Sequence, residues 1–287
     1  MIINQDTNVL IIGLGVIGGS YAKALHKNGI EVNCITKNQA DIDLAMQENC
    51  IKQGSTVVDP TLVQNADIVI FALYPHTFIQ WIKEYQHLLK SGAIITDVTG
   101  VKNGLVQEIQ AILRKDIEFI ACHPMAGRES SGFAFSDDNV FKGANFLITP
   151  IPQNTQNAIE TAECLGRLLG FGKITSLSVS EHDKMIAFLS QLTHCIAITL
   201  MNCNNTPNLE TFTGDSFRDL TRIAKINDEM WSELFIWNKN ELVDQIDNFI
   251  AHFESLKESI LNEDKQHLRE LMQNSTQRRS LFDKPKN

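Results

Sequence analysis

The sequence lacks several features that would each point to a particular class of protein. Its six cysteines include no C-x-x-C pair and several lie in apolar stretches, so neither a metal site nor a disulfide framework is expected. No apolar run reaches the roughly 20 residues that a membrane span needs, and the first residues do not read as a signal peptide. The net charge of −9 argues against general affinity for nucleic acid or anionic membranes. We therefore expect a cytoplasmic protein with reduced thiols and without a metal, membrane or nucleic-acid partner.

What the chain does contain is typical of a globular protein. Its 287 residues are enough for two domains of ordinary size. Hydrophobic residues make up 43% and charged residues 21%, which is a usual balance for a protein with a sizeable buried core.

A glycine-rich turn near the start of the chain lies between a predicted strand and a predicted helix. Val9–Ile12 is a short apolar run typical of a buried strand, and Ser20–His26 continues as a helix. Gly13, Gly15 and Gly18 between them have the G-x-G-x-x-G spacing of dinucleotide-binding turns. In such a turn the first glycine permits the tight bend, the second lets backbone approach a pyrophosphate, and the third lets helix and strand pack closely.

The free N–H groups at the start of this helix would bind the pyrophosphate, because the helix dipole favours negative charge there. We therefore expect the cofactor to be bound by Gly13, Gly15, Val16, Ile17 and Gly18.

Strands and helices alternate over the first 178 residues. The strands are predicted at Val9–Ile12, Glu31–Thr36, Ala66–Leu73, Ala93–Val98, Glu118–Cys122, Asn145–Thr149 and Ile174–Ser178, with helices at about 76–89 and 155–169. Alternation of this kind predicts an α/β fold with a doubly wound, mostly parallel sheet, which is the Rossmann arrangement.

Three of these strands end in polar or turn-forming residues, and the carboxyl ends of parallel strands share one edge of a sheet. Leu73 and Tyr74 end one strand and Thr99 follows another, so we expect all three to lie near the cofactor. His123 is predicted just after a third strand, before Pro124. A histidine there has a pKa near neutrality and can exchange a proton with a substrate hydroxyl.

The end of the second strand bears on the choice between NAD and NADP. An acidic residue usually binds the ribose hydroxyls of NAD there, but this chain reads Thr36-Lys37-Asn38, with no acid until Asp41. A hydroxyl beside an ammonium group suits a 2′-phosphate, so Thr36 and Lys37 tilt the prediction towards NADP. The alternative is that Lys37 is a solvated loop charge.

From Ser180 onwards the chain is predicted to be entirely helical. Helices are expected at Glu181–Met201, from Asp228 to about Leu261, and at Lys265–Met272, followed by a polar, frayed tail at Gln273–Asn287. These patterns divide the chain into a dinucleotide-binding domain, residues 1–178, and a helical domain, residues 179–287. Since the helical half has apolar residues on more than one face, we expect it to pack against a twin in a symmetric homodimer.

Several motifs, taken together and in order, resemble the prephenate dehydrogenase family, which includes arogenate dehydrogenases. In the first half they are Gly13–Ser20, Asp97–Lys102 and His123–Gly132. In the second half Glu181–Lys184 and Ser190–His194 resemble the family's histidine-bearing helix, and Phe217–Ala224, Met230-Trp231 and Asn238 resemble its substrate-binding stretch.

The resemblance implies an NAD(P)-dependent oxidative decarboxylation of prephenate to 4-hydroxyphenylpyruvate, a step of tyrosine biosynthesis. It implies that His123 acts on the substrate hydroxyl, that Arg222 grips a carboxylate of the dianionic substrate, and that His194 is a second contact. It also implies that Glu129 shapes or gates the pocket and that Trp231 and Asp219 lie near the substrate. His182 and His194, twelve residues apart, are expected to share roughly one helix face.

One position departs from the family pattern. The family usually has a serine where this chain has Gly100, and Thr99 is the neighbour that could supply a catalytic hydroxyl, although successive side chains of an extended chain alternate in direction. The alternatives are an arogenate dehydrogenase, a non-catalytic dinucleotide-sensing regulator and a generic β-hydroxyacid dehydrogenase. The last would need a catalytic lysine in the helical half, where none stands out.

Overall fold

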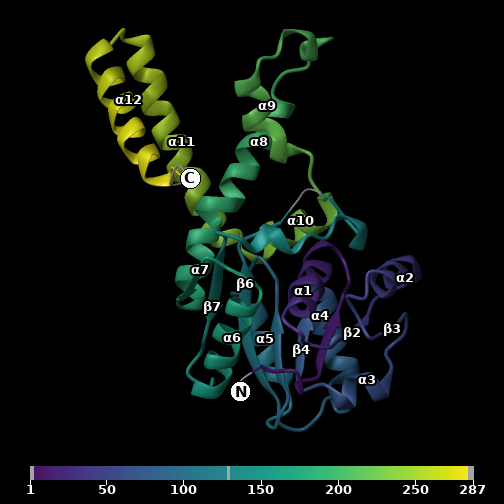
Figure 1. Cartoon of the computed structure of the whole chain (residues 1–287). Helices are drawn as coiled ribbons and strands as arrows, with labels where there is room; N and C mark the ends of the chain where they lie inside the picture. Colours follow the sequence, from purple (N-terminus) through teal and green to yellow (C-terminus); the bar gives the residue numbers. More distant parts are fainter. Residues whose placement is uncertain (1–2, 128–129, 284–287) are drawn as a thin grey trace. The chain divides into compact units, whose positions relative to one another are not determined.

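The computed structural model describes residues 3–127 and 130–283 and contains one eight-stranded sheet, followed by helices (Figure 1). The strand order is β3-β2-β1-β4-β5-β6-β7-β8, and all neighbours are parallel except β6 and β7. The predicted doubly wound, mostly parallel sheet with an all-helical second half is confirmed.

The strands are β1 (Val9–Ile12), β2 (Val32–Ile35), β3 (Gln53–Ser55), β4 (Ile68–Phe71), β5 (Ile94–Asp97), β6 (Glu118–Pro124), β7 (Asn145–Thr149) and β8 (Lys173–Ser176). The helices are α1 (Val16–Lys27), α2 (Gln39–Gln47), α3 (Pro60–Asn65), α4 (Pro75–Tyr85), α5 (Leu105–Ile112), α6 (Gln156–Leu168), α7 (Val179–Ile186), α8 (Leu192–Asn202), α9 (Asp215–Thr221), α10 (Asp228–Trp237), α11 (Lys239–Leu261) and α12 (Lys265–Arg279).

Strand β1 lies at the centre of the sheet and is buried on both faces. Val9 and Ile11 belong to an apolar cluster with residues of α1 and α6, whereas Leu10 and Ile12 belong to a second cluster with residues of α4 and α5. Side chains alternate across a strand, so a central strand covered by helices on both faces must be apolar at every position. This is why the run Val9–Ile12 could be recognised in the sequence.

Several boundaries differ from those predicted. Strand β6 continues through His123 to Pro124, because it pairs with β7 as far as Phe146. Gln273–Arg279, predicted as the start of a frayed tail, are helical, since α12 continues to Arg279. The predicted helix from Asp228 to Leu261 is interrupted at Asn238.

Helices α7 and α8 are joined by a π-helical turn, Ala187–Gln191, and form one continuous helical stretch. By length and composition this stretch, Val179–Asn202, could cross a membrane, so our expectation that no run reaches that length is wrong. Its buried residues His182 and Asp183, however, are hydrogen-bonded to the sheet region at His123 and Lys102, as described below. These buried polar contacts hold the start of the stretch against the sheet, whereas apolar side chains further along it, such as Phe188 and Met201, are exposed.

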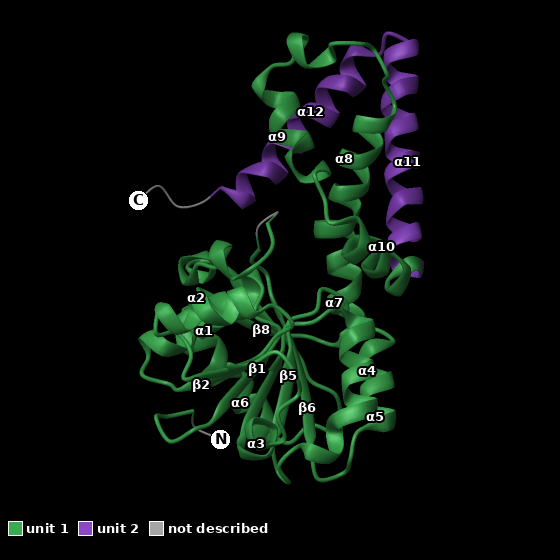
Figure 2. Ribbon diagram, turned by 90° about the vertical axis from the view of Figure 1, so that its right-hand side faces the viewer, with its two compact units in different colours: residues 1–239 green, residues 240–287 purple. Residues whose placement is uncertain are grey.

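The chain divides into two compact units, residues 1–239 and 240–287, which Figure 2 colours separately. The first holds the sheet and helices α1 to α10. The second holds nearly all of α11 together with α12. These two helices are joined by a short turn in which Asp264 caps the first turn of α12. Every candidate site residue named below that the structure describes lies in the first unit.

Candidate active site

The glycine turn between β1 and α1 has the geometry expected for binding a dinucleotide. Gly13 has a φ of +97°, and a Cβ on it would lie 2.3 Å from the carbonyl oxygen of Ala72, so only glycine fits. A Cβ on Gly18 would lie 2.0 Å from the carbonyl oxygen of Gly13, which is the close helix–strand approach predicted for this position. Gly15, in contrast, has nothing within 4 Å of where its Cβ would be. The turn is therefore closed on the protein side and open where backbone would face a ligand.

The first turn of α1 can accept an anion. Gly15 is its N-cap residue and makes no side-chain capping bond, and the first turn, which includes Val16 and Ile17, carries no acidic residue. The N–H groups at a helix start have no partner within the helix, so this end of α1 attracts phosphate. Leu73, predicted near the cofactor, lies beside the turn, with its Cδ2 3.1 Å from the position of a Cβ on Gly13.

The end of β2 offers no carboxylate for a ribose. Asp41 is the first acid after the strand, and its Oδ1 accepts a hydrogen bond of 3.0 Å from the backbone N–H of Phe133. Thr36 is half-buried and Lys37 exposed, and Asn38 caps α2 by accepting from Ala40 N. Since Asp41 is bonded to another segment, Thr36 and Lys37 are the polar side chains at this strand end.

Tyr74, the third residue predicted at the edge of the sheet, is the N-cap residue of α4. Its hydroxyl accepts a hydrogen bond of 3.1 Å from Asn227 Nδ2, at the start of α10. It therefore joins the cofactor edge of the sheet to the helical part of the first unit.

His123 lies inside β6, paired with Leu147 of β7, and not after the strand as predicted. Its ring is half-buried, and Nδ1 lies 2.9 Å from Nε2 of His182 in α7. On the other side of the ring, a Cβ on Gly100 would lie 3.9 Å from Nε2. The two ring nitrogens thus have different surroundings: Nδ1 contacts a histidine, and Nε2 faces the backbone of Gly100.

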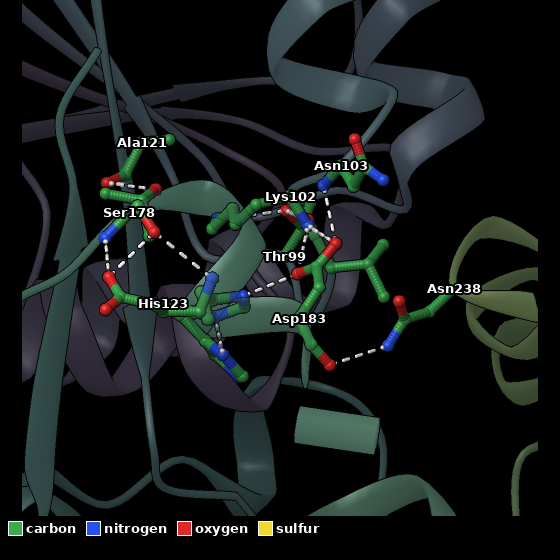
Figure 3. Close-up of polar contacts among 12 residues, drawn as sticks. Thr99, Lys102, Asn103, Ala121, His123, Ser178, Asp183 and Asn238 are labelled. Carbon is green, nitrogen blue, oxygen red and sulfur yellow. Dashed lines mark hydrogen bonds and ion pairs between the residues drawn. The ribbon is translucent and has the colours of Figure 1, made fainter. Parts of the chain in front are cut away.

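His182 is in turn bonded to the next residue in the chain. Its Nδ1 lies 2.6 Å from Oδ1 of Asp183, and both side chains are fully buried. The Asp183 carboxylate also accepts bonds from two backbone N–H groups, those of Lys102 (3.0 Å) and Asn103 (2.6 Å), which follow β5 (Figure 3). His123, His182 and Asp183 therefore form a hydrogen-bonded row between β6 and α7.

A buried ion pair lies behind this row. Lys102 Nζ is 2.6 Å from Asp97 Oδ2 and donates to the carbonyl oxygen of Cys122, which precedes His123, at 2.6 Å. Both charged side chains have no exposed surface. A buried charge is tolerated only when it is paired and hydrogen-bonded, as it is here.

Thr99 belongs to the same buried cluster. Its hydroxyl bonds to Asp97 and to the carbonyl oxygen of Val101, and it accepts a bond from Lys102 Nζ at 3.1 Å. These partners occupy the hydroxyl, so the geometry favours a structural role for Thr99 over the substitution for the family serine that we considered. The expected alternation of side chains accounts for this, since Thr99 points inward.

The surroundings lower the pKa values of both histidines. Burial, followed by the charges of His182 and Lys102, holds the pKa of His123 well below the usual value of 6.5. Burial also lowers the pKa of His182, and its bond to Asp183 opposes that shift only in part. Both rings are consequently neutral at neutral pH, and a neutral imidazole can accept a proton.

The residues predicted to bind substrate come from α8, α9 and α10. The His194 ring stacks on Trp231, with ring centroids 3.7 Å apart, and His194 Nδ1 lies 2.8 Å from the carbonyl oxygen of Ser190. Asp219 and Arg222 are exposed, the latter as the first residue of the short turn Arg222–Ala224 after α9. Glu129 lies outside the described residues.

The expectation that His182 and His194 share a face assumed a regular helix between them, whereas a π-helical turn, Ala187–Gln191, lies between the two residues. The structure gives them different neighbours, His123 for the first and Trp231 for the second. The roles of Asp97, Lys102, His182 and Asp183 were not predicted, although the motifs that contain them were recognised. Among the described residues, no group of three or more His, Cys, Asp or Glu side chains could hold a metal ion.

Known proteins resemble this chain over nearly its whole length. Residues 21–170 match the family model described as prephenate dehydrogenase, nucleotide-binding domain, and residues 178–274 match prephenate dehydrogenase, dimerization domain. The prephenate dehydrogenase of Bacillus subtilis strain 168 is 28% identical over 277 residues, covering 92% of this chain and 72% of that protein. The cyclohexadienyl dehydrogenase of Zymomonas mobilis is 28% identical over 283 residues, covering 95% and 94%.

The fold agrees with these matches. The crystal structure of prephenate dehydrogenase from A. aeolicus in complex with hydroxyphenyl propionate and NAD+ superposes with a TM-score of 0.89 at 30% sequence identity, and covers 96% of this chain and 98% of that one. The strand order, the open glycine turn and the two matched domains lead to one conclusion: the chain belongs to the prephenate dehydrogenase family.

Proposed function

We propose that this protein is an NAD(P)-dependent prephenate dehydrogenase of tyrosine biosynthesis that acts in the cytoplasm. The observation that carries the proposal is the neutral imidazole of His123, held in a strand of the same sheet that presents the open glycine turn. A hydride acceptor and a proton acceptor at one sheet edge are what oxidation of a ring alcohol needs. Membership of the family supplies the substrate class.

The residues around the glycine turn fit a nicotinamide dinucleotide. Gly13, Gly15 and Gly18 shape the turn, and the N–H groups of Val16 and Ile17 at the start of α1 would face the pyrophosphate. Leu73 and Tyr74 would line the neighbouring strand end. When bound, the nicotinamide supplies the acceptor for the hydride that leaves the hydroxyl-bearing ring carbon of the substrate.

His123 would act on the substrate hydroxyl. As the hydride leaves the ring carbon, the hydroxyl proton passes to Nε2 of the imidazole and a ring ketone forms. The electron pair of the bond to the departing carboxylate then enters the ring, so carbon dioxide is lost and the ketone oxygen becomes a phenolate. The proton held on Nε2 of His123 then returns to that oxygen and gives the phenol. Aromaticity favours this second step, which needs little beyond correct positioning.

The substrate carries two carboxylates, and Arg222 is our choice for binding one of them, because a guanidinium can bind a carboxylate with two parallel hydrogen bonds. His194 and Trp231, whose rings are stacked, would form a further wall of the pocket. We propose Asp219 and Glu129 as residues near the substrate on the family's pattern. Within this division of labour, residues 1–178 would bind the cofactor and residues 179–287 would contribute to substrate binding and dimer formation.

A preference for NADP over NAD follows from the end of β2. The hydroxyl of Thr36 and the ammonium of Lys37 would accept a 2′-phosphate, and the nearest carboxylate, on Asp41, is bonded to Phe133 N. Lys37→Ala is expected to weaken NADP binding by about tenfold and leave NAD binding within a factor of two, because one charge-assisted bond is lost. Isothermal titration with both nucleotides measures this, and an equal loss for both would contradict the preference.

A homodimer is proposed for the helical half. The matched family model is described as a dimerization domain. Large apolar side chains are exposed in each compact unit: Met185, Phe188, Leu189, Met201, Phe212 and Leu220 in the first, and Val243, Phe249, Ile250, Phe253, Ile260 and Leu261 in the second. Exposed apolar surface of this extent marks an interaction site. Sedimentation at increasing protein concentration tests whether two chains associate.

The activity is tested with purified protein, prephenate, and NAD+ or NADP+. Formation of the reduced cofactor together with carbon dioxide is expected, and silence with both cofactors would contradict the proposal. Arogenate, which carries an amine where prephenate has a keto group, is assayed alongside, since no described residue separates the two substrates. Cofactor binding without turnover of either substrate would favour a dinucleotide-sensing regulator instead.

A further inference from the structure

We infer that His182 is a positioning residue that, together with Asp183, fixes the proton of His123 on Nδ1 and so leaves Nε2 free of a proton and able to accept one from the substrate. The inference rests on the proposed function, because it gives His123 the role of proton acceptor. It follows from the order of donors and acceptors along the row His123–His182–Asp183.

The carboxylate of Asp183 sets the direction of this row. Both backbone N–H groups that reach it, from Lys102 and Asn103, are donors, so the carboxylate acts as an acceptor throughout. The ring nitrogen at 2.6 Å from it, Nδ1 of His182, must therefore carry a proton. In a neutral imidazole the other nitrogen, Nε2, is then an acceptor.

The same reasoning extends to His123. Nε2 of His182 lies 2.9 Å from Nδ1 of His123, and an acceptor at that distance needs a donor opposite it. Nδ1 of His123 therefore holds the proton, and the neutral ring has its lone pair on Nε2. This is the nitrogen that faces Gly100, where a Cβ would come within 3.9 Å.

The row is held rigidly enough to impose this arrangement. His182 and Asp183 are fully buried, and the backbone carbonyl of Asp183 accepts a 3.0 Å bond from Asn238 Nδ2 (Figure 3). The helix that carries them begins with a capping box between Ser178 and Glu181. The other charges near the two rings are the paired Lys102 and Asp97, which stay outside the row.

Asp183→Asn is the variant that tests the direction of the row. Its amide oxygen can accept from the two backbone N–H groups, which turns its NH2 group towards His182 Nδ1. That nitrogen must then be an acceptor, so the protons of both histidines move to the opposite nitrogens and Nε2 of His123 becomes protonated. A neutral imidazole with the wrong tautomer cannot act as the base.

The experiment uses the full-length protein with 15N-labelled histidine, and long-range 1H–15N spectra at a pH where His123 is neutral. The His123 signals are identified from their loss in His123→Asn. Wild type is expected to have the proton on Nδ1, and Asp183→Asn to have it on Nε2, with kcat lowered by about 10²–10⁴-fold. The KM for prephenate and the Kd for the cofactor are expected to stay within about threefold, since neither depends on the tautomer.

Three further variants keep the test decisive. His182→Gln retains a side-chain oxygen that can accept from His123 Nδ1, so it is expected to keep more activity than His182→Leu, which removes the acceptor. This pair gives the answer if Asp183→Asn does not fold. Glu181→Gln is the matched control: it removes a charge from an exposed residue of the same helix, and glutamine also serves in a capping box.

The proposal is overturned if wild-type His123 carries its proton on Nε2, or if it keeps the proton on Nδ1 in Asp183→Asn. Equal activity of His182→Leu and wild type would overturn it as well. Because the spectra report the tautomer without turnover, a protein that binds the cofactor but does not oxidise prephenate would refute the proposed function and still answer this question.

Discussion

The two groups of residues proposed to act on substrate are held in different ways. His123 lies in a strand and is bonded to a buried histidine, a buried aspartate and, through them, two backbone N–H groups. Arg222 and Asp219 are exposed on the short segment around α9, which is flanked by exposed apolar side chains such as Phe212 and Leu220. The proposed base is thus organised by the core of the first compact unit, whereas the proposed substrate-binding group lies on an exposed segment.

This difference explains which part of the site one chain can preorganise. A buried group with all its hydrogen bonds made cannot move without breaking several of them, so its geometry is fixed before substrate arrives. An exposed side chain keeps more freedom than a buried one, and the freedom that an arginine loses when its ligand binds reduces the affinity it provides. Changes in the first region should therefore appear in kcat, and changes in the second in KM.

The largest effect is expected for His123→Asn. Removing the proton acceptor should lower kcat by about 10²–10⁴-fold, which is the usual contribution of general base catalysis, with cofactor affinity unchanged. Steady-state kinetics and cofactor titration measure the two quantities. If the variant keeps more than a tenth of wild-type kcat, His123 is not the proton acceptor, and the difference between the two regions does not hold.

Arg222→Ala is expected to raise KM for prephenate by about 10–100-fold, because a charge-assisted bond to a carboxylate contributes roughly 1.5–3 kcal/mol. The change in kcat should be smaller. Arg222→Lys keeps the charge without the planar two-donor fork, and it should fall between wild type and Arg222→Ala. If kcat fell and KM did not, Arg222 would act in the transition state and the division between the regions would be wrong.

The pH dependence of kcat/KM tests whether the buried surroundings of His123 control its protonation. Since its pKa is held well below 6.5 in the folded protein, the ring stays neutral from alkaline pH down past that value, and activity should fall by about tenfold per pH unit only below the lowered pKa. The free energy of unfolding should change with pH in the same direction as the activity. Between the lowered pKa and about 6.5 the unfolded chain binds more protons, so the free energy of unfolding falls as pH falls through that window.

The two measurements separate activity from folding. Rates are taken after brief exposure to each pH, and urea unfolding is recorded at the same pH values. An acid limb centred above 6.5 would show that burial does not control His123.

The smallest effect is expected for Gly100→Ser. A Cβ there has ordinary contacts, 3.6 Å to Leu234 Cδ1 and 3.9 Å to His123 Nε2, so the fold should accept it. A serine hydroxyl could then hydrogen-bond to the substrate hydroxyl beside Nε2 and orient it, which we expect to raise kcat/KM by about threefold. Gly100→Ala has the same Cβ without the hydroxyl and should leave kcat/KM unchanged. Equal effects of the two variants would exclude the hydroxyl as the cause.

Much of the fold could be predicted because its signals are local. The central strands are apolar at consecutive positions, and the glycines stand where a positive φ or a close approach requires them, as Gly13 and Gly18 do. Strand β3, with the sequence Gln-Gly-Ser at the edge of the sheet, contains no apolar residue and was not predicted. Its pairing with β2 depends on the neighbouring strand, and not on its own composition.

The site was only partly predictable for a related reason. His123 was identified from its place near a strand end, but its bond to His182 depends on the packing of α7 against β6, which no local pattern contains. Lys102 was recognised only as part of a motif, and its burial could not be predicted because it depends on Asp97 and the Cys122 carbonyl oxygen, which lie within reach of its amine. Contacts between distant segments decide such roles.

The π-helical turn Ala187–Gln191 holds one residue more than the α-helical turn it replaces, because its hydrogen bonds join residues i and i+5 instead of i and i+4. Removing one residue from this turn would restore an α-helix and leave everything beyond it at nearly the same angle relative to His182. His194 would then stay beside the ring of Trp231, while His182 kept its place beside β6. A deletion within α7 after His182 would instead turn His194 by about 100° around the helix axis, so a single-residue deletion should be tolerated better in the π-helical turn than in α7.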